Sequence, residues 1–282
     1  MKRLYGIIGD PIEHTLSPDM HQFWYHQDHV AHHYHVFHVT KDQLETAVQG
    51  IKALGISGCN VTIPHKVAII PFLDDLDDEA RMLGAVNTVV NKNGKLIGYN
   101  TDGLGFLRSL EHHQKYHLPD HPQVLVIGAG GAGQAIALTM AKYGARCVDI
   151  TNRTIEKAVK LSRSCQVFCE SNGISLTEAE NGLEKYDVIV NATSIGLSEH
   201  DSLIPIPIEN SKSSAIFVDI IYNFETKWLR LAKQQGKRTL DGLPMLIFQG
   251  AISYKHWLGH LPKLNDMDAF LRNKLEERHA NE

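Results

Sequence analysis

A glycine-rich turn between a predicted strand and a predicted helix constrains the fold of this 282-residue chain more than any other feature. The segment VLVIGAGGAGQAIALTM starts as an apolar strand and then places Gly128, Gly130 and Gly133 in a G-x-G-x-x-G pattern at the head of a helix. These glycines permit, in turn, a tight turn, close approach of the backbone to a pyrophosphate, and close packing of helix on strand. The helix N-terminus offers free N–H groups and its positive dipole end to phosphate. The segment therefore predicts a dinucleotide site formed by the whole turn: Gly128, Ala129, Gly130, Gly131, Ala132 and Gly133.

The residues after the next predicted strand indicate which nicotinamide dinucleotide is bound. An NAD site usually places Asp or Glu there to bind the ribose hydroxyls. This chain instead has Asn152, Arg153 and Thr154, with Lys157 one helical turn later. Guanidinium and ammonium groups suit the additional 2′-phosphate of NADP, so the pattern favours NADP as the cofactor. The alternative is that Arg153 is only a surface residue and that Asp149, within the strand, binds the ribose.

Apolar runs alternate with helical patterns along most of the chain, which is typical of an α/β fold with parallel strands. Strands are expected at residues 4–9 and 34–39 and at CNVTI in the first hundred residues, and at YDVIVNAT and AIFVDIIY later. A helix is expected over about 104–116, and the last forty residues are helical twice.

Local signals mark several element boundaries. Ser17, followed by Pro18, is a typical N-cap before a first helix. Thr40 can cap the next helix, which Gly55 ends. Asn93-Gly94 between two β-rich runs predicts a hairpin.

Composition excludes several classes of function. The net charge is −4 and the isoelectric point is near 6.5, whereas a nucleic-acid-binding protein needs a basic face. No apolar run reaches the roughly 18 residues of a membrane span. The start MKRLYGIIGD lacks the long apolar stretch and cleavage site of a signal peptide, so we expect a cytoplasmic protein without nucleic-acid or membrane partners.

Cysteine and histidine usage does not predict a metal site. The four cysteines form no C-x-x-C pair. Seventeen histidines are unusual, and seven of them lie between residues 21 and 38. His26 and His29 have the i, i+3 spacing that can hold a metal, but no carboxylate or cysteine motif surrounds them. We expect solvated surface histidines and no metal, and the role of this segment stays open.

Polar motifs in the first half of the chain predict a binding site. HTLSP, NVTIPHK, GAVNT and YNTDGLGF each fall near a predicted strand end or turn, where binding residues tend to lie. Together they supply hydroxyls, amides, one amine and one carboxylate. This inventory suits a small ligand with several hydroxyl groups.

Eight motifs in order give the chain a resemblance to the shikimate dehydrogenase family over nearly its whole length. They are GDPIEHTLSP, GCNVTIPHK, GAVNTVV, GYNTDGLGF, VIGAGGAG, TNRT, NATSIGL and DGLPMLIFQGA. The resemblance implies an oxidoreductase of aromatic amino acid biosynthesis (the shikimate pathway) that reversibly reduces 3-dehydroshikimate to shikimate with NADPH. It also implies a substrate-binding α/β domain of residues 1–103, completed by C-terminal helices at 241–282 that pack back on it. Residues 104–240 would form a Rossmann-type NADP-binding domain.

Matched by motif position, Lys66 and Asp102 are implied to be the catalytic pair. Interconverting an alcohol and a ketone requires proton transfer at oxygen, which a positioned acid/base accelerates. A lysine can fill this role when burial favours its neutral form. The residues leave open how the proton role is divided, and without the resemblance Lys66 reads equally well as a surface lysine and Asp102 as a helix N-cap.

The same matching implies two further sets of contacts. The implied substrate contacts are Thr15, Ser17, Asn60, Thr62, Asn87, Tyr222 and Gln249. The implied contacts near the nicotinamide are Thr193, Ser194, Ile220 and Gly242.

Three points stay open. The family usually has serine where this chain has Thr15, which leaves a quinate or dual quinate/shikimate dehydrogenase as an alternative. A non-catalytic relative would be expected to lack Lys66 or Asp102, and both are present. The protein is expected to be a monomer or a homodimer.

Overall fold

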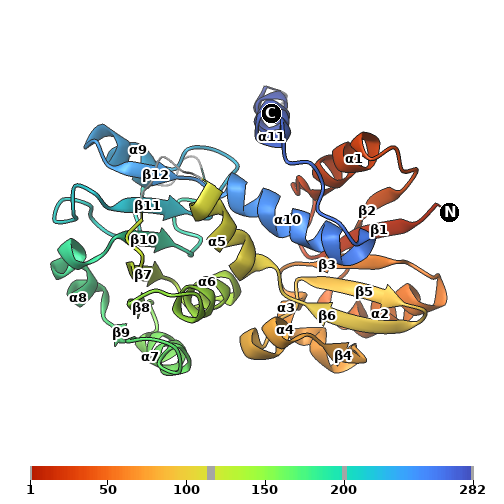
Figure 1. Cartoon of the computed structure of the whole chain (residues 1–282), viewed down its shortest axis with the longest axis horizontal. Helices are drawn as coiled ribbons and strands as arrows, with labels where there is room; N and C mark the ends of the chain where they lie inside the picture. The colour runs from red at the N-terminus through yellow and green to blue at the C-terminus, as the bar shows by residue number, and fades with distance from the viewer. Residues whose placement is uncertain (1, 113–117, 199–201, 281–282) are drawn as a thin grey trace. The chain divides into compact units, whose positions relative to one another are not determined.

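The computed structural model describes residues 2–112, 118–198 and 202–280, which form two compact units (Figure 1). The first unit combines Met1–Thr101 with Ile247–Glu282, and the second comprises Asp102–Leu246. The helix expected over 104–116 is described as α5 (Asp102–His112), and the rest of that prediction lies outside the described residues.

The first unit contains a six-stranded mixed sheet with the order β2-β1-β3-β5-β6-β4. Strands β1, β2 and β3 are parallel, whereas β5 runs antiparallel to both β3 and β6. The predicted hairpin joins β5 to β6, with Asn93 and Gly94 at φ of 56° and 89°, values that favour Asn and Gly. The strands are β1 (Leu4–Gly9), β2 (His33–His38), β3 (Gly58–Val61), β4 (Asp75–Leu76), β5 (Thr88–Lys92) and β6 (Lys95–Tyr99).

One face of this sheet is covered by helices from both ends of the chain. The Trp257 indole of α10 donates to the Val89 carbonyl of β5 at 3.0 Å, and Gly250 of α10 packs against Met20 of α1. Phe270 of α11 stacks near Phe23 of α1 with ring centroids 4.6 Å apart. The C-terminal helices thus pack back on the first unit, as predicted. The helices are α1 (Ser17–Gln27), α10 (Leu243–Leu258) and α11 (Met267–His279).

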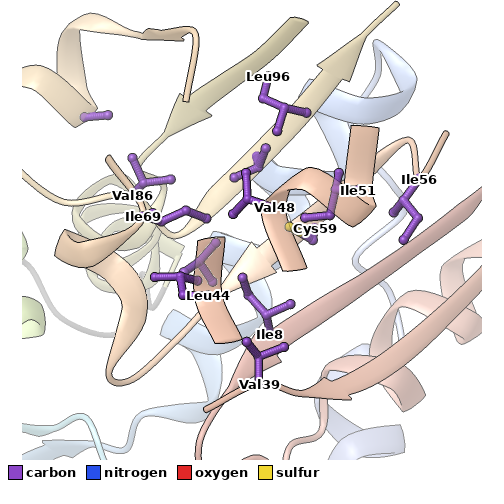
Figure 2. Close-up of a cluster of buried hydrophobic side chains, with 13 residues drawn as sticks. Ile8, Val39, Leu44, Val48, Ile51, Ile56, Cys59, Ile69, Val86 and Leu96 are labelled. Carbon is purple, nitrogen blue, oxygen red and sulfur yellow. The ribbon is translucent and has the colours of Figure 1, made fainter. Parts of the chain in front are cut away.

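The opposite face buries an apolar cluster beneath α2 (Leu44–Ala53) (Figure 2). Leu44, Val48 and Ile51 recur at helical spacing on α2 and meet Ile8 of β1. The short helix α4 (Asp78–Leu83) contributes Ala80 to this cluster, and Ile69, directly after the short helix α3 (His65–Ala68), also belongs to it. The central strands β1 and β3 are therefore largely buried between these two layers.

The second unit contains a six-stranded sheet in which every pairing is parallel, with the order β12-β11-β10-β7-β8-β9. Counted within this unit, the order is 3-2-1-4-5-6 read from β9, which is that of the Rossmann fold. The predicted Rossmann-type α/β architecture is confirmed. The strands are β7 (Gln123–Ile127), β8 (Cys147–Thr151), β9 (Gly173–Ile174), β10 (Val188–Asn191), β11 (Ile216–Asp219) and β12 (Arg238–Leu240). Besides α5, the helices are α6 (Gly131–Lys142), α7 (Ile155–Cys165), α8 (Leu176–Asn181) and α9 (Lys227–Gln234).

Two predicted helix caps are wrong in detail. Ser17 is the first residue of α1 rather than its N-cap, and the residue at the cap position, Leu16, makes no side-chain cap. Thr40 precedes a short 3₁₀ turn, and its hydroxyl donates to the Asp42 carboxylate at 2.7 Å instead of capping the backbone. In both places a nearby polar side chain competes for the hydroxyl.

Candidate functional site

The glycine-rich turn of the second unit has the geometry that a pyrophosphate requires. Gly128 has a φ of 110°, and a Cβ there would lie 2.8 Å from the Ala192 carbonyl oxygen. A Cβ at Gly133 would overlap the Gly128 carbonyl oxygen. Only glycine at position 133 therefore lets α6 pack this closely on the turn. By contrast, a Cβ at Gly130 or Gly131 would meet no atom within 4 Å. The helix N-terminus therefore opens onto free space, as a backbone cradle for phosphate should.

The loop after β8 and the first turn of α7 leave two basic side chains exposed. The Asn152 side chain accepts from the Ala129 N–H at 3.1 Å and donates to the Thr154 carbonyl at 2.9 Å, which ties the loop to the glycine turn. Arg153 and Lys157 are exposed, and neither forms an ion pair with another described residue. This arrangement suits a ligand phosphate.

Asp149, the alternative ribose ligand, is already engaged inside the fold. Its carboxylate accepts from the Tyr186 hydroxyl at 2.9 Å and from both the backbone and the side-chain amide of Asn172 at 3.0 Å. The residue is 9% exposed. Asp149 therefore stabilises the sheet edge between β8 and β9, and this favours the NADP interpretation.

A buried Asn–Asp pair holds the loops that follow β10 and β11. Asn191 and Asp219 are paired in register at the ends of these strands, and both are fully buried. The Asn191 side-chain oxygen accepts from the Thr193 hydroxyl at 2.7 Å, and Asp219 accepts from the Ile221 N–H at 3.1 Å and the Thr226 hydroxyl at 3.0 Å. Burial raises the pKa of Asp219 to about 6, against these hydrogen bonds.

Three of the predicted nicotinamide contacts, Thr193, Ser194 and Ile220, lie on these loops, and the fourth, Gly242, lies between β12 and α10. Thr193 and Ile220 are half-buried, and Ser194 is exposed. Gly242 donates its N–H to the Ile221 carbonyl at 3.0 Å, and a Cβ at Gly242 would overlap the Ile220 backbone. The loops of adjacent parallel strands thus meet at the carboxyl edge of the sheet, where this fold binds its ligands.

In the first unit, Thr15 and Ser17 form a pair of hydroxyls at the start of α1. The Thr15 hydroxyl donates to the Ser17 hydroxyl at 3.1 Å and accepts from the Ser17 N–H at 3.2 Å. Ser17 is buried and Thr15 is half-buried. Two adjacent hydroxyls are suited to binding a carboxylate, and both residues are among the substrate contacts that motif matching implies.

Asn60 and Asn87 lie in one buried hydrogen-bond network. The Asn60 amide donates to the Asn87 carbonyl at 3.2 Å, and the Asn87 amide donates to the Thr101 hydroxyl at 2.9 Å and to Gln249 at 3.4 Å. Ser253 joins the network through the Asn60 amide at 3.1 Å. Three of the predicted substrate contacts, from β3, the segment before β5, and α10, are thus brought together.

Lys66 lies in the short helix α3, which begins directly after Pro64. The Lys66 carbonyl accepts from the Val86 N–H at 2.7 Å, and the preceding His65 is buried with its Nε2 atom 2.6 Å from the Val39 carbonyl oxygen. Lys66 itself is half-buried. The Thr62 backbone carbonyl, at the start of this turn, accepts from the His65 N–H at 2.8 Å. The backbone around Lys66 is therefore tied to the rest of the first unit by hydrogen bonds on both sides.

Asp102 is the first residue of α5 and is 6% exposed. The next residue, Gly103, packs so tightly on α6 that a Cβ would overlap the Thr139 side chain. Tyr222, the remaining predicted contact, is half-buried in the loop after β11.

Several network residues were missed because nothing in their local sequence distinguishes them. Tyr34, Thr88 and Ser253 are brought to Asn60 only by strand pairing and by the return of α10. Thr101 stands inside a motif that was recognised, YNTDGLGF, and its position beside Asp102 was the available signal.

The histidine-rich segment is not uniformly exposed. His21 and His32 are buried, so the expectation of solvated histidines is wrong for these two, whereas His26, His29, His33, His35 and His38 are exposed. Among the described residues, no group of three His, Cys, Asp or Glu side chains is arranged to hold a metal ion. Across the same part of the chain, no helix is both long enough and apolar enough to cross a membrane.

Comparison with known proteins gives two family matches. Residues 7–89 match the model of the shikimate dehydrogenase substrate binding domain, and residues 112–222 match that of shikimate / quinate 5-dehydrogenase. The chain is 46% identical to the shikimate dehydrogenase (NADP(+)) of Bacillus cytotoxicus over 98% of its length and 99% of the relative's. It is 45% identical to that of Geobacillus kaustophilus over 95% and 96% of the two chains.

Solved structures agree with these matches. Shikimate 5-dehydrogenase from Thermus thermophilus, in complex with NADP(H) and shikimate, superposes with a TM-score of 0.86 at 33% identity, over 96% of this chain and 99% of that one. A quinate dehydrogenase from Corynebacterium glutamicum, in complex with NAD, has a TM-score of 0.89 but a lower identity of 27%, over 97% and 100% of the two chains.

Proposed function

This chain belongs to the shikimate dehydrogenase family, and we propose that it catalyses the NADPH-dependent, reversible reduction of 3-dehydroshikimate to shikimate. The observation that carries this proposal is the 45–46% identity, over nearly the full length, to relatives named for this activity. Identity to the quinate enzyme is much lower, so quinate is not the favoured substrate.

NADP is the cofactor that the second unit fits. The open space at Gly130 and Gly131 accommodates a pyrophosphate at the α6 N-terminus. The exposed Arg153 and Lys157 side chains would hold the 2′-phosphate. Since the Asp149 carboxylate is taken by Tyr186 and Asn172, it is not available to bind the ribose hydroxyls of NAD.

The first unit supplies groups that suit the substrate. The Thr15 and Ser17 hydroxyls would bind its carboxylate. Asn60, Asn87 and Gln249 would bind ring hydroxyls, since amides can both donate and accept. Thr62 and Tyr222 are the other proposed contacts.

Lys66 and Asp102 are the proposed catalytic residues. NADPH, when bound, supplies the hydride that is added to the ketone carbon. The protein must then protonate the developing alkoxide, and a positioned acid accelerates that step by about 10²–10⁴-fold. Lys66, whose backbone carbonyl accepts from the Val86 N–H, is the proposed proton donor, and the buried Asp102 carboxylate is proposed to orient the reacting hydroxyl. Reversal of these steps oxidises shikimate.

We also propose the domain limits 1–103 and 104–240, with 241–282 completing the first domain. The compact units, which divide near Thr101 and Ile247, support these limits. A monomeric or homodimeric cytoplasmic enzyme is part of the same proposal.

An absorbance assay at the NADPH band tests this function. Shikimate and quinate are each offered with NADP and with NAD, and the highest kcat/KM is expected for shikimate with NADP. A higher kcat/KM for quinate with NAD would reject the proposal.

A further inference from the structure

An aromatic cluster lies under the substrate-binding network of the first unit, and one of its members is joined to that network. The cluster contains Tyr25, Tyr34 and Trp257 packed around His21. The Tyr34 hydroxyl donates to the Asn60 side-chain oxygen at 2.7 Å. The buried Tyr25 hydroxyl, in contrast, has no hydrogen-bond partner among the described residues.

The orientation of the Asn60 amide follows from its partners. Its nitrogen lies 3.2 Å from the Asn87 backbone carbonyl oxygen, which can only accept a hydrogen bond. The nitrogen must therefore face Asn87, and the oxygen must face Tyr34. Because the Asn60 oxygen only accepts, the Tyr34 hydroxyl must be the donor.

This orientation limits what Asn60 can offer a ligand. Both N–H groups are taken up by the Asn87 carbonyl, the Thr88 hydroxyl at 3.2 Å and the Ser253 hydroxyl at 3.1 Å. Of the two lone pairs on its oxygen, Tyr34 occupies one. Asn60 can thus accept one hydrogen bond from a ligand hydroxyl and can donate none without giving up an internal bond.

Tyr34 is itself held firmly. Its ring stacks on the His21 imidazole with centroids 4.5 Å apart and planes 9° apart. Burial lowers the pKa of His21 to about 3, so this ring stays neutral at ordinary pH. Burial also raises the pKa of Tyr34 well above its ordinary value, so the phenol remains a hydrogen-bond donor.

We propose that Tyr34 is a positioning residue for the substrate: its hydroxyl locks the Asn60 amide so that one lone pair of the Asn60 oxygen faces a substrate ring hydroxyl. The inference rests on the proposed function and adds to it a residue that does not itself touch the substrate. It also assigns Asn60 the acceptor role toward that hydroxyl.

The substitution Tyr34→Phe removes the hydroxyl and keeps the ring stacked on His21. The expected result is a rise in the KM for shikimate of about three- to tenfold, corresponding to one net hydrogen bond, with little change in kcat. The KM for NADP should not change. The matched control is Tyr25→Phe, which removes a hydroxyl of the same cluster. Because the Tyr25 hydroxyl has no hydrogen-bond partner among the described residues, both KM values should stay unchanged.

Two further measurements separate positioning from general packing. In the Asn60→Ala background, adding Tyr34→Phe should cause no further rise in the shikimate KM, because the group that Tyr34 orients is gone. Shikimate analogues that lack one ring hydroxyl give the same test without a second substitution. For the analogue missing the hydroxyl that Asn60 binds, Tyr34→Phe and the wild type should have equal KM values.

The wild-type assay distinguishes the two proposals. A wild type that does not oxidise shikimate with NADP would overturn the proposed function. An active wild type with an unchanged shikimate KM in Tyr34→Phe would overturn the positioning role alone. Equal rises in the shikimate and NADP KM values, or the same penalty for every analogue, would also overturn it.

Discussion

Asn191 and Asp219 lie opposite each other at the carboxyl ends of β10 and β11, with the Asn191 amide nitrogen 3.2 Å from both Asp219 carboxylate oxygens. Both side chains are fully buried. Asn191 also accepts from Thr193, and Asp219 accepts from the Ile221 N–H, so the pair holds two loops that are proposed to line the cofactor site. The pair therefore links the stability of the second unit to the ionisation of one carboxyl group.

Stability should depend on the protonation of Asp219. Burial raises the pKa of this carboxyl from 3.8 to about 6, so between these values the folded state binds more protons than the unfolded state. The free energy of unfolding contributed by Asp219 therefore falls as the pH rises through this window, by about 3 kcal/mol at most. Asp219→Asn removes this dependence, and denaturant unfolding of both proteins from pH 4 to pH 7 should show the wild type losing stability relative to the variant.

Asp74 provides a control of the opposite sign. Its exposed carboxylate pairs with Lys52 at 2.8 Å, and its pKa is lowered by this partner and by the Leu96 N–H. Relative to Asp74→Asn, the wild type should lose stability as the pH falls. If Asp219→Asn gave the same slope as Asp74→Asn, the raised pKa of Asp219 would be wrong.

Replacing Lys66 should affect catalysis more than binding. Lys66→Ala removes the proposed proton donor, so kcat should fall by about 10²–10⁴-fold, while the KM for shikimate changes much less. Steady-state kinetics with shikimate and NADP measures both. Lys41→Ala removes an exposed lysine of the same unit and should leave the kinetics unchanged. Near-normal turnover in Lys66→Ala would exclude Lys66 from the mechanism.

A second variant, Asp102→Asn, addresses how proton transfer is divided between Lys66 and Asp102. The dependence of its kcat on pH, compared with that of the wild type, measures this division.

Removing the Arg153 guanidinium should weaken NADP binding selectively. Arg153→Ala is expected to raise the KM for NADPH about ten- to a hundredfold, since charged hydrogen bonds contribute about 1.5–3 kcal/mol. The KM for NADH, which lacks the phosphate, should barely change. Arg163→Ala removes an exposed arginine from α7, the helix that follows the Arg153 loop, and should alter neither value. Equal effects of Arg153→Ala on both cofactors would show that Arg153 does not bind the phosphate.

A methyl group at Gly133 should disturb the cofactor turn. The Cβ of Gly133→Ala would overlap the Gly128 carbonyl, and because this atom belongs to the backbone, α6 must shift. Thermal unfolding should show a loss of about 1–3 kcal/mol, and NADP affinity should fall. Gly50→Ala, in α2, meets no atom within 4 Å and should instead raise stability by about 0.5–1 kcal/mol. The explanation fails if the two substitutions change the melting temperature in the same direction.

Local patterns in the sequence predicted many of the elements well, but predicted side-chain partners poorly. The Asn93-Gly94 hairpin and the glycine-rich turn formed as expected because their backbone angles depend on the residues themselves. The capping roles of Ser17 and Thr40 were wrong because each hydroxyl has an alternative partner within two residues. The buried positions of His21 and His32 also went unpredicted, since nothing local distinguishes them from their exposed neighbours.

The sequence by itself determined the α/β class, the Rossmann-type unit with its phosphate turn, and the family, because periodicity, glycine positions and motif order are local properties. Only the tertiary structure decided that Asp149 is engaged by Tyr186, that Asn60 is oriented by Tyr34, and that Asn191 pairs with Asp219. Each of these pairs joins residues at least 26 positions apart in the chain. Strand pairing and helix return place them together, and burial then makes each hydrogen bond costly to leave unmade.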